Sequence, residues 1–407
     1  MHAVDVFGIP LDFVLFGLTL MGVALFHAKT LQVALAGLGV LTVYKVFWGG
    51  FAHGSGLEGL AAHLGHEWVV LANLLGLLIG FALLSRHFEQ SKVPALLPAL
   101  LPDGWEGGFA MLAMVFVLSS FLDNIAAALI GGAMAHTLFR GKVHVGYLAG
   151  IVAASNAGGS GSVVGDTTTT MMWIAHKSPL DVLHAYVAAA AALMVFGIPA
   201  ALQQHRYSPI LADPPEGTKA DFRHLAVVLL VLLAAVTTNV VVNTRFPAAG
   251  DRFPWLGAAV TLAVVLCAPI RAPDWKVVPD AAKGAVFLLS LVTCASMMPV
   301  DRLPGASWHT SMGLGFLSAV FDNIPLTALA LKQGGYDWGM LAYAVGFGGS
   351  MIWFGSSAGV AISNMYPEAK SVGSWLRNGW HVTVAYVVGF LVLLAVNGWV
   401  PEVGKGP

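Results

Sequence analysis

The sequence predicts an all-α polytopic membrane protein made of two related halves, each containing a re-entrant hairpin and a broken transmembrane helix. Three observations lead to this prediction. Apolar residues make up 57% of the 407 residues and charged residues 10%, whereas soluble domains carry about 45–50% and about 25%. Apolar runs long enough to cross a bilayer recur along the chain. Two polar motifs each occur once in either half.

The charge and the cysteines exclude some classes of partner. With 20 Lys and Arg against 21 Asp and Glu, the chain lacks the basic excess that neutralises phosphates, so we expect no nucleic-acid partner. Cys267 and Cys294 lie in apolar segments and indicate core filling rather than a disulfide framework or a zinc site. No Lys or Arg precedes the first apolar run, so we interpret that run as a retained span rather than a secretory signal.

Ten apolar runs are predicted to cross the membrane, because a hydrocarbon core of ~30 Å needs about 20 residues of helix. These runs cover residues 11–27, 30–48, 67–85, 144–175, 182–204, 224–242, 254–270, 281–299, 337–365 and 379–400. The loop before the third run holds His53, His63, His66 and Glu67. We expect solvated side chains in this external loop, with a weak metal site or pH sensor as the alternative.

Two further apolar stretches, 107–138 and 311–331, are predicted to enter the membrane and turn back. Each carries Asp-Asn at its middle, and basic residues flank 107–138 at both ends, which places both of its ends in the cytoplasm. Two arms of about ten residues rise ~15 Å, half of the hydrocarbon thickness, so the tip would lie near the midplane. The alternative for either stretch is a plain crossing helix.

The distribution of basic residues predicts the orientation. With ten crossings and two hairpins, the loops on one side hold 13 of the 20 Lys and Arg residues, and that side is expected to be cytoplasmic. Both termini then lie outside, as does the loop that contains Lys45.

An internal repeat runs through the chain. Residues 118–125 and 317–324 share the pattern L-S-x-x-x-D-N-I, and Gly158-Gly159-Ser160 followed by Gly165 matches Gly348-Gly349-Ser350 followed by Gly355. Because each half has five crossings, the second half must start from the opposite side, which makes the repeat inverted. The halves are 1–204, with a hairpin at 107–138 and a broken helix at 144–175, and 223–407, with a hairpin at 311–331 and a broken helix at 337–365; a polar linker, 205–222, joins them. Inverted repeats with broken helices are typical of secondary transporters.

The glycine-rich segments are predicted to interrupt their helices. Each glycine lowers helix propensity by up to ~1 kcal/mol, and backbone groups freed within lipid need new partners, so unwinding is tolerated where it lines a site. Close packing of small residues is the alternative, but it would not explain Asp166 and the four threonines that follow. A phosphate loop is disfavoured because no Lys follows the glycines.

Three carboxylates are predicted to lie deep in the membrane with no Lys or Arg in their motifs: Asp123, Asp166 and Asp322. Intramembrane ionisable residues mark functional sites, and we expect these to hold a proton or a metal cation. Neutral oxygen donors surround them in the sequence: Asn124, Asn156, Thr167, Thr168, Ser318, Asn323, Ser356 and Ser357. Hard oxygen ligands suit Na⁺ or Li⁺ better than zinc or copper.

The paired motifs resemble those of the ion transporter superfamily, which includes divalent-anion/sodium symporters, arsenite permeases and NhaD-type sodium/proton antiporters. The stretch 156–173, NAGGSGSVVGDTTTTMMW, is most similar to the NhaD pattern N-A-G-G-x-x-[ST]-x-x-G-D-x-T-T-x-M-[LM]-W. The resemblance covers residues 67–400 and is sharpest in the four motifs. The chain departs from the pattern at Gly161-Ser162-Val163, where bulkier residues or Pro are usual.

The resemblance implies a scaffold domain from the first three spans of each half, 11–85 and 224–299, and a transport domain of hairpins and broken helices. It also implies a homodimer built on the scaffold, placement in the bacterial inner membrane and transport rather than an enzymatic reaction, with no cofactor. Its functional residues fall on Asp123, Asn124, Asn156, Asp166, Thr168, Ser318, Asp322, Asn323, Ser356 and Ser357. Na⁺ is expected at Asp123, Asn156, Asp166, Asp322 and Asn323.

We therefore predict exchange of Na⁺ and Li⁺ for H⁺ by alternating access. A sodium-coupled dicarboxylate or citrate symporter is the alternative on the same fold. The hairpin tips of those relatives carry a neutral Ser-Asn-Thr, whereas both tips here read Asp-Asn, and a carboxylate within ~4–6 Å of an anionic substrate would repel it. A channel or a non-transporting receptor is a third possibility, which broken-helix repeats fit less well.

Overall fold

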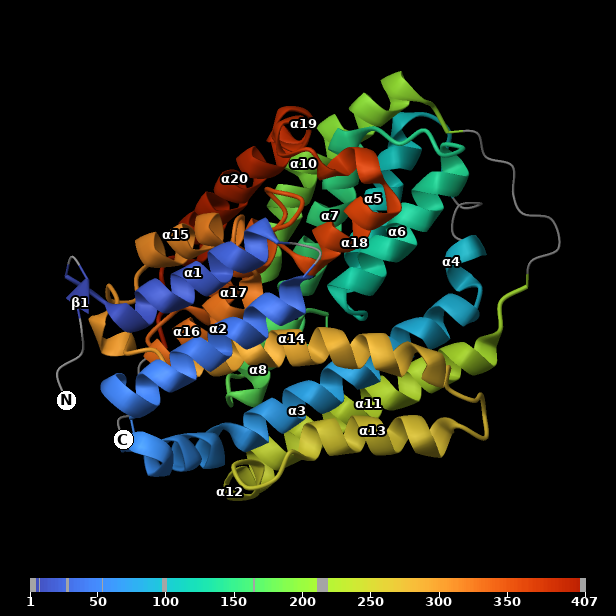
Figure 1. Cartoon of the computed structure of the whole chain (residues 1–407). Coiled ribbons are helices and arrows are strands. Elements are labelled where there is room, and N and C mark those ends of the chain that lie inside the picture. The colour runs from blue at the N-terminus through green and yellow to red at the C-terminus, as the bar shows by residue number, and fades with distance from the viewer. Residues whose placement is uncertain are drawn as a thin grey trace.

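The computed structural model describes residues 5–6, 8–26, 29–52, 54–96, 101–163, 165–210 and 219–402. This part of the chain is mostly helical, as predicted for an all-α polytopic membrane protein (Figure 1). Its strands are two short antiparallel ones, β1 (Asp5–Val6) and β2 (Ile9–Pro10).

Six helical segments of the described chain are long and apolar enough to cross a bilayer. They contain α2 (Thr30–Tyr44) with the π-helix Lys45–Gly49, α3 (Gly56–Gln90), α9 (Pro179–Leu183) with α10 (Ala185–Tyr207), α11 (Phe222–Arg245), the 3₁₀-helix Trp275–Val277 with α14 (Val278–Ser296), and α20 (Trp380–Asn397). Two other predicted spans form shorter apolar helices, α1 (Leu11–Leu25, 15 residues) and α13 (Trp255–Cys267, 13 residues).

All four predicted interruptions occur, so neither Asp-Asn stretch nor either glycine-rich stretch is one continuous helix. The interrupted pairs are α5 (Trp105–Ser119) with α6 (Asn124–Leu138), α7 (Val145–Gly159) with α8 (Thr167–Ile174), α15 (Trp308–Ser318) with α16 (Asn323–Gln333), and α17 (Trp338–Gly348) with α18 (Ser357–Met365). Short helices connect the rest: α4 (Val93–Leu96), α12 (Pro247–Gly250), Val300–Arg302, Pro367–Lys370 and α19 (Val372–Asn378).

Local chemistry explains where the half-helices begin. Asp123 and Asp322 precede α6 and α16 with the same backbone angles, φ −52° and ψ 140°. Each carboxylate accepts a hydrogen bond from the backbone N–H two residues later, at 3.1 and 3.0 Å. An acidic N-cap satisfies a helix donor that would otherwise be free, so the Asp-Asn pair starts a new helix in both halves.

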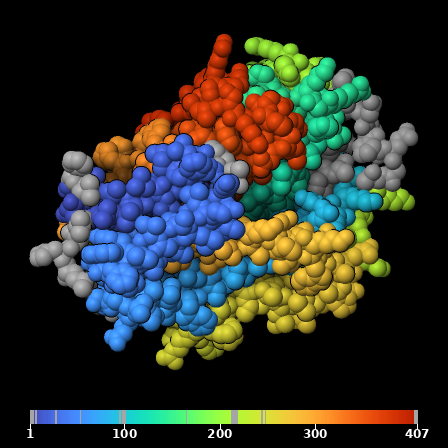
Figure 2. Space-filling view, in the orientation of Figure 1, coloured from blue at the N-terminus to red at the C-terminus, as the bar shows by residue number. Residues whose placement is uncertain are grey.

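The helices pack in two sets. Helices α1, α2, α3, α11, α13 and α14 contact mainly one another, and α5 to α10 contact α15 to α20. In Figure 1 the first set is coloured blue and yellow to gold, and the second green and orange to red. A main junction between the sets is the contact of α14 with α16. On the face seen in Figure 2, α14 lies in gold beside the blue N-terminal helices.

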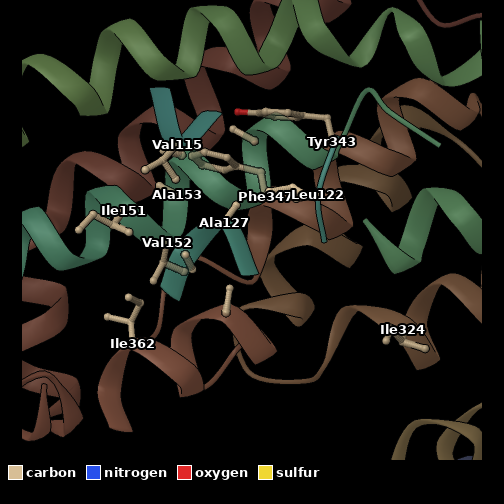
Figure 3. Packing of buried hydrophobic residues seen from close by; sticks show 14 of the residues in the cluster. Val115, Leu122, Ala127, Ile151, Val152, Ala153, Ile324, Tyr343, Phe347 and Ile362 are labelled. Carbon is tan, nitrogen blue, oxygen red and sulfur yellow. The ribbon is translucent and has the colours of Figure 1, made fainter. Parts of the chain in front are cut away.

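Within the second set the two sequence halves interlock. Helix α10 packs on α20, α6 on α18, and α8 on α16. Figure 3 shows the resulting core, in which Val115, Ile151 and Val152 of the first half lie near Phe347 and Ile362 of the second. Cys267 and Cys294 are buried and not bonded to each other, as predicted for core residues.

The prediction that His63, His66 and Glu67 lie in an external loop is wrong. Helix α3 begins at Gly56, so His63, His66 and Glu67 are helical, and His63 is only 4% exposed with its Nε2 2.9 Å from Ser296 Oγ. The helix continues beyond the apolar run because Leu and Ala, which favour helix, are interspersed with the polar residues. His53 lies outside the described residues.

Lys45 also differs from its predicted place in an external loop. Its Nζ lies 2.9 Å from Asp12 Oδ1, and the two residues are 7% and 2% exposed. This ion pair joins the start of α1 to the end of α2. A buried charge requires such a partner, which lies 33 residues away in the sequence.

Candidate functional site

Asp166 is the most buried of the three predicted site carboxylates. It is 2% exposed and stands at the start of α8, immediately after the break that follows α7. Its Oδ1 accepts a hydrogen bond from Asn124 Nδ2 at 3.3 Å. Its Oδ2 is buried and accepts no hydrogen bond of normal geometry in the described chain, although the hydroxyl and the backbone N–H of Thr168 lie close enough to interact with the carboxylate.

Two asparagines connect this carboxylate to the second half of the chain. Asn124 Nδ2 also donates to Asn156 Oδ1 at 3.0 Å. Asn156 Nδ2 donates to Ser350 Oγ at 2.9 Å and to Ser356 Oγ at 3.1 Å. The predicted site residues Asn124, Asn156, Asp166 and Ser356 therefore form one buried network that spans three helix breaks.

The threonines after Asp166 have different positions. Thr167 faces the large cavity described below. Thr169 Oγ1 donates to the carbonyls of Ser162 and Asp166, and Thr170 Oγ1 donates to those of Val163 and Asp166. These two hydroxyls satisfy backbone oxygens that the break releases, as buried polar groups require. Sequence reasoning did not select Thr169, Thr170 or Ser350, although Ser350 belongs to the repeated glycine motif and both threonines lie in the stretch 156–173.

The two hairpin-tip carboxylates face different spaces. Asp123 lines a cavity of about 620 Å³ together with Asn124, Asp166 and Asn323. Asp322 lines a separate cavity of about 150 Å³, which is bordered by Phe321, Phe354 and Ser356. The five residues expected to hold Na⁺ therefore do not all open onto one cavity. No group of three or more His, Cys, Asp or Glu residues in the described chain forms a metal site.

Ser318 and Ser357 complete the predicted set. Ser318 Oγ donates to Val345 O at 2.7 Å, and in the first half Ser119 Oγ makes the equivalent bond to Ser155 O. These hydroxyls tie the tips to the broken helices. Ser357 lies on both cavities.

The larger cavity leads from an exposed charged rim to Asp166. The rim carries Arg86, Glu89, Asp274, Lys276 and Asp280, and the walls are mainly apolar residues such as Leu78, Phe81 and Leu288. Arg86 contacts Glu89 at 2.8 Å and Asp274 at 3.1 Å.

The Arg86 contact fixes the charge of one rim carboxylate. Its hydrogen bond lowers the pKa of Asp274, because a donor to the charged form favours that form. Asp274 therefore stays negative to a lower pH than a free aspartate.

The arrangement of Asp166 favours a small positive ligand. A buried carboxylate oxygen without a donor is costly unless a proton or a cation compensates it. The surrounding groups are carboxylate, hydroxyl and amide oxygens, which are hard ligands. The basic residues among the described lining, Arg86 and Lys276, belong to the rim rather than to the Asp166 network.

Another buried acidic residue was not predicted. The Asp337 side chain is 0% exposed; it caps α17 through the N–H of Met340 and lies 2.7 Å from His184 Nε2. A short polar residue before an apolar run is a helix-start signal, and it could have located the cap, but its histidine partner lies 153 residues away.

Comparison with known proteins identifies similar transporters. No family model matches the chain. Sodium/proton antiporters 1 and 2 of Arabidopsis thaliana are each 27% identical to it, over 78% and 79% of this chain and 58% and 81% of their own lengths. The Na⁺/H⁺ antiporter NhaD of Alkalimonas amylolytica is 23% identical over 82% of this chain and 78% of its own length.

These relatives confirm the predicted resemblance to NhaD-type antiporters. The chain spans 58% of the length of Arabidopsis antiporter 1. The names of the relatives describe transporters rather than enzymes.

Proposed function

We propose that this chain is a secondary transporter that exchanges Na⁺, and also Li⁺, for H⁺. The observation that carries the proposal is Asp166 Oδ2, a buried carboxylate oxygen without a hydrogen-bond partner in the described chain, on a residue that lines a cavity with an exposed rim. Na⁺ and H⁺ would compete for this oxygen, and intramembrane carboxylates of this kind serve ion and proton pathways. The names of the relatives support the same pair of ions.

Each network residue has a role in this proposal. Asp166 carries the titrating charge, the Thr168 hydroxyl beside it supplies a second oxygen, and Asn124 orients the carboxylate through Oδ1. Asn156 holds the first broken helix against the second through Ser350 and Ser356. A proton on Asp166 removes its charge and releases the cation.

Alternating access would use an inverted repeat with two re-entrant hairpins, 107–138 and 311–331. The matching Asp caps and the matching serine bonds support the repeat. Gln333 Nε2 donates to Pro304 O at 2.7 Å, and this contact between residues on either side of the second stretch supports a hairpin there. The linker 205–222 would join the halves 1–204 and 223–407; its residues 211–218 lie outside the described part.

The two packing sets support a division into a scaffold, 11–85 and 224–299, and a transport domain that contains the hairpins and the broken helices. We further propose a homodimer formed through the scaffold, a bacterial inner-membrane location, and both termini on the outer face. A sodium-coupled carboxylate symporter is not favoured, because Asp123 and Asp166 face the cavity that an anion would enter.

The proposal is tested in proteoliposomes with an imposed pH gradient. Addition of Na⁺ or Li⁺ should dissipate the gradient, whereas a dicarboxylate added at constant Na⁺ should have no effect. Apparent Na⁺ affinity should rise with pH until the site is deprotonated and then level off. No cation-dependent proton movement, or an affinity that is flat from acid to alkaline pH, would refute a site shared by Na⁺ and H⁺.

A further inference from the structure

The internal repeat loses its match at the position that faces Asp166. Aligning the two glycine motifs pairs Asn156 with Gly346, Asp166 with Ser356 and Thr168 with Ala358. The first half therefore supplies the carboxylate, the amide and the hydroxyl. The second half has smaller side chains at these positions.

The contacts of the paired positions are equivalent across the repeat. Asn156 reaches Ser350 and Ser356 of the second half. Gly346 faces the corresponding residues of the first half, because a Cβ added to Gly346 would lie 3.1 Å from Asp166 Oδ2 and 3.7 Å from the Cβ of Ser160. The side chain that Gly346 lacks would thus point at the carboxylate oxygen that has no partner among the described residues.

We propose that Gly346 is a specificity-determining residue of the cation site, because its missing side chain leaves Asp166 Oδ2 open to a small, dehydrated monovalent cation. This inference rests on the proposed function. The Asn156 amide of the first half donates to Ser356 of the second half. Gly346, at the equivalent position of the second half, has no amide that could donate to Asp166 Oδ2, and the cation or proton binds this oxygen instead. Gly346 also lies in the last turn of α17, where the negative end of the helix dipole favours positive charge.

Backbone packing does not account for this glycine. Gly348, two residues later, has a packing reason, since its added Cβ would lie 2.2 Å from Gly315 O. At Gly346 the only contact shorter than 3.4 Å is with Asp166 Oδ2. Gly inside a helix costs roughly 0.5–1 kcal/mol relative to Ala, so a helical alanine would be favourable here apart from its effect on the carboxylate.

The test compares Gly346→Ala with Gly313→Ala, a glycine in α15 whose added Cβ would have no neighbour within 4 Å. The readouts are the shift of thermal unfolding with added NaCl or LiCl and exchange in proteoliposomes. Gly346→Ala should fold normally without cations and lose Na⁺ affinity by about tenfold or more, because ligand distances in ion sites hold to within about 0.2 Å. Li⁺, being smaller, should lose less, so the ratio of Li⁺ to Na⁺ affinity should rise. The control should match the parent.

Gly346→Ser provides a second variant, because its hydroxyl could donate to Oδ2 and should also weaken Na⁺ binding. Unchanged Na⁺ and Li⁺ affinities in both variants would overturn the assignment. An equal loss of Na⁺ and Li⁺ affinity, together with a lower unfolding temperature in the absence of both ions, would also overturn it. A failure of both variants to fold would do the same, because either result would make Gly346 a packing residue. In each case the parent's exchange would still support the proposed function, whereas a parent without a Na⁺ response would refute that function first.

Discussion

At the residue scale, Asp166 combines burial with an unfilled ligand position. Its Oδ1 is held by Asn124, while its Oδ2 has no donor among the described residues. Because a single carboxylate oxygen can be neutralised by either a proton or a cation, one residue can couple the two ions. Thr169 and Thr170 satisfy the backbone instead.

Asp166→Asn should abolish Na⁺/H⁺ exchange while the protein remains folded. The amide keeps the size and one oxygen of the side chain but removes the titrating charge. Exchange in proteoliposomes and thermal unfolding in detergent measure the two effects. The matched control is Asp251→Asn, whose side chain is 70% exposed and which should exchange like the parent. Parent-like rates in Asp166→Asn would remove this residue from the mechanism.

The two tip carboxylates should contribute unequally. Asp123 shares the large cavity with Asp166, whereas Asp322 faces the smaller, separate one. Asp123→Ser should therefore lower Na⁺ affinity more than Asp322→Ser, and serine retains the helix cap in both variants. Titration of exchange rate against Na⁺ concentration gives the comparison. An equal loss in both would mean that the cavities are not separate in the working protein.

At the element scale, glycine lets the broken helices approach the adjacent arms. A Cβ on Gly158 would lie 2.0 Å from Phe116 O, and one on Gly348 would lie 2.2 Å from Gly315 O. The same close approach therefore occurs in both halves. It places the broken helix against α5 in the first half and against α15 in the second.

Gly158→Ala should destabilise the protein by about 1–3 kcal/mol, the usual cost of overpacking, because a backbone carbonyl cannot move aside as a side chain can. Gly39→Ala in α2 is the control, since its added Cβ would have no neighbour within 4 Å. Thermal unfolding in detergent distinguishes them. Equal unfolding temperatures would show that the helices can separate without cost.

The Asp12–Lys45 pair should stabilise the contact between α1 and α2. Lys45→Met leaves Asp12 buried without a partner, and breaking a buried pair in this way costs about 3–5 kcal/mol. Replacing both residues, as in Asp12→Leu with Lys45→Met, should recover most of the loss. Denaturant unfolding of the two variants tests this. A single variant as stable as the parent would indicate that this ion pair does not hold α1 against α2.

At the scale of the whole molecule, the two helix sets meet largely through α14 and α16. This limited junction is suited to relative movement, whereas the interlocked halves within the second set would move together. The proposed inverted topology can be tested by labelling residues at the two membrane surfaces. It predicts that the ends of one Asp-Asn stretch are accessible from the cytoplasm and the ends of the other from the outside.

Single cysteines at positions 90 and 140 should react with an impermeant thiol reagent from the cytoplasmic side, and those at 304 and 333 from the outside. Each pair brackets one proposed hairpin, so both members should label from the same side. The buried Cys267 and Cys294 should give little background, which the parent protein measures. Labelling of one pair from opposite sides would indicate a crossing between its members.

The local sequence determined the membrane class of this protein, the positions of its helix breaks and most of its candidate site residues. Composition predicted the membrane class, and the breaks before Asn124, Thr167, Asn323 and Ser357 followed from caps and glycines that act within a few residues. The residues of the Asp166 network were also found by motif. The motifs did not reveal which of the three carboxylates has an open ligand position.

Tertiary structure alone decided the partners across long separations. Asp12 meets Lys45, Asp337 meets His184, and Gly346 faces Asp166 because helices distant in sequence pack together. The same packing buries His63, which hydropathy had placed in a loop. Hydropathy and helix propensity report the tendency of a segment to enter the membrane or form a helix, but the neighbour of a side chain depends on how those helices pack.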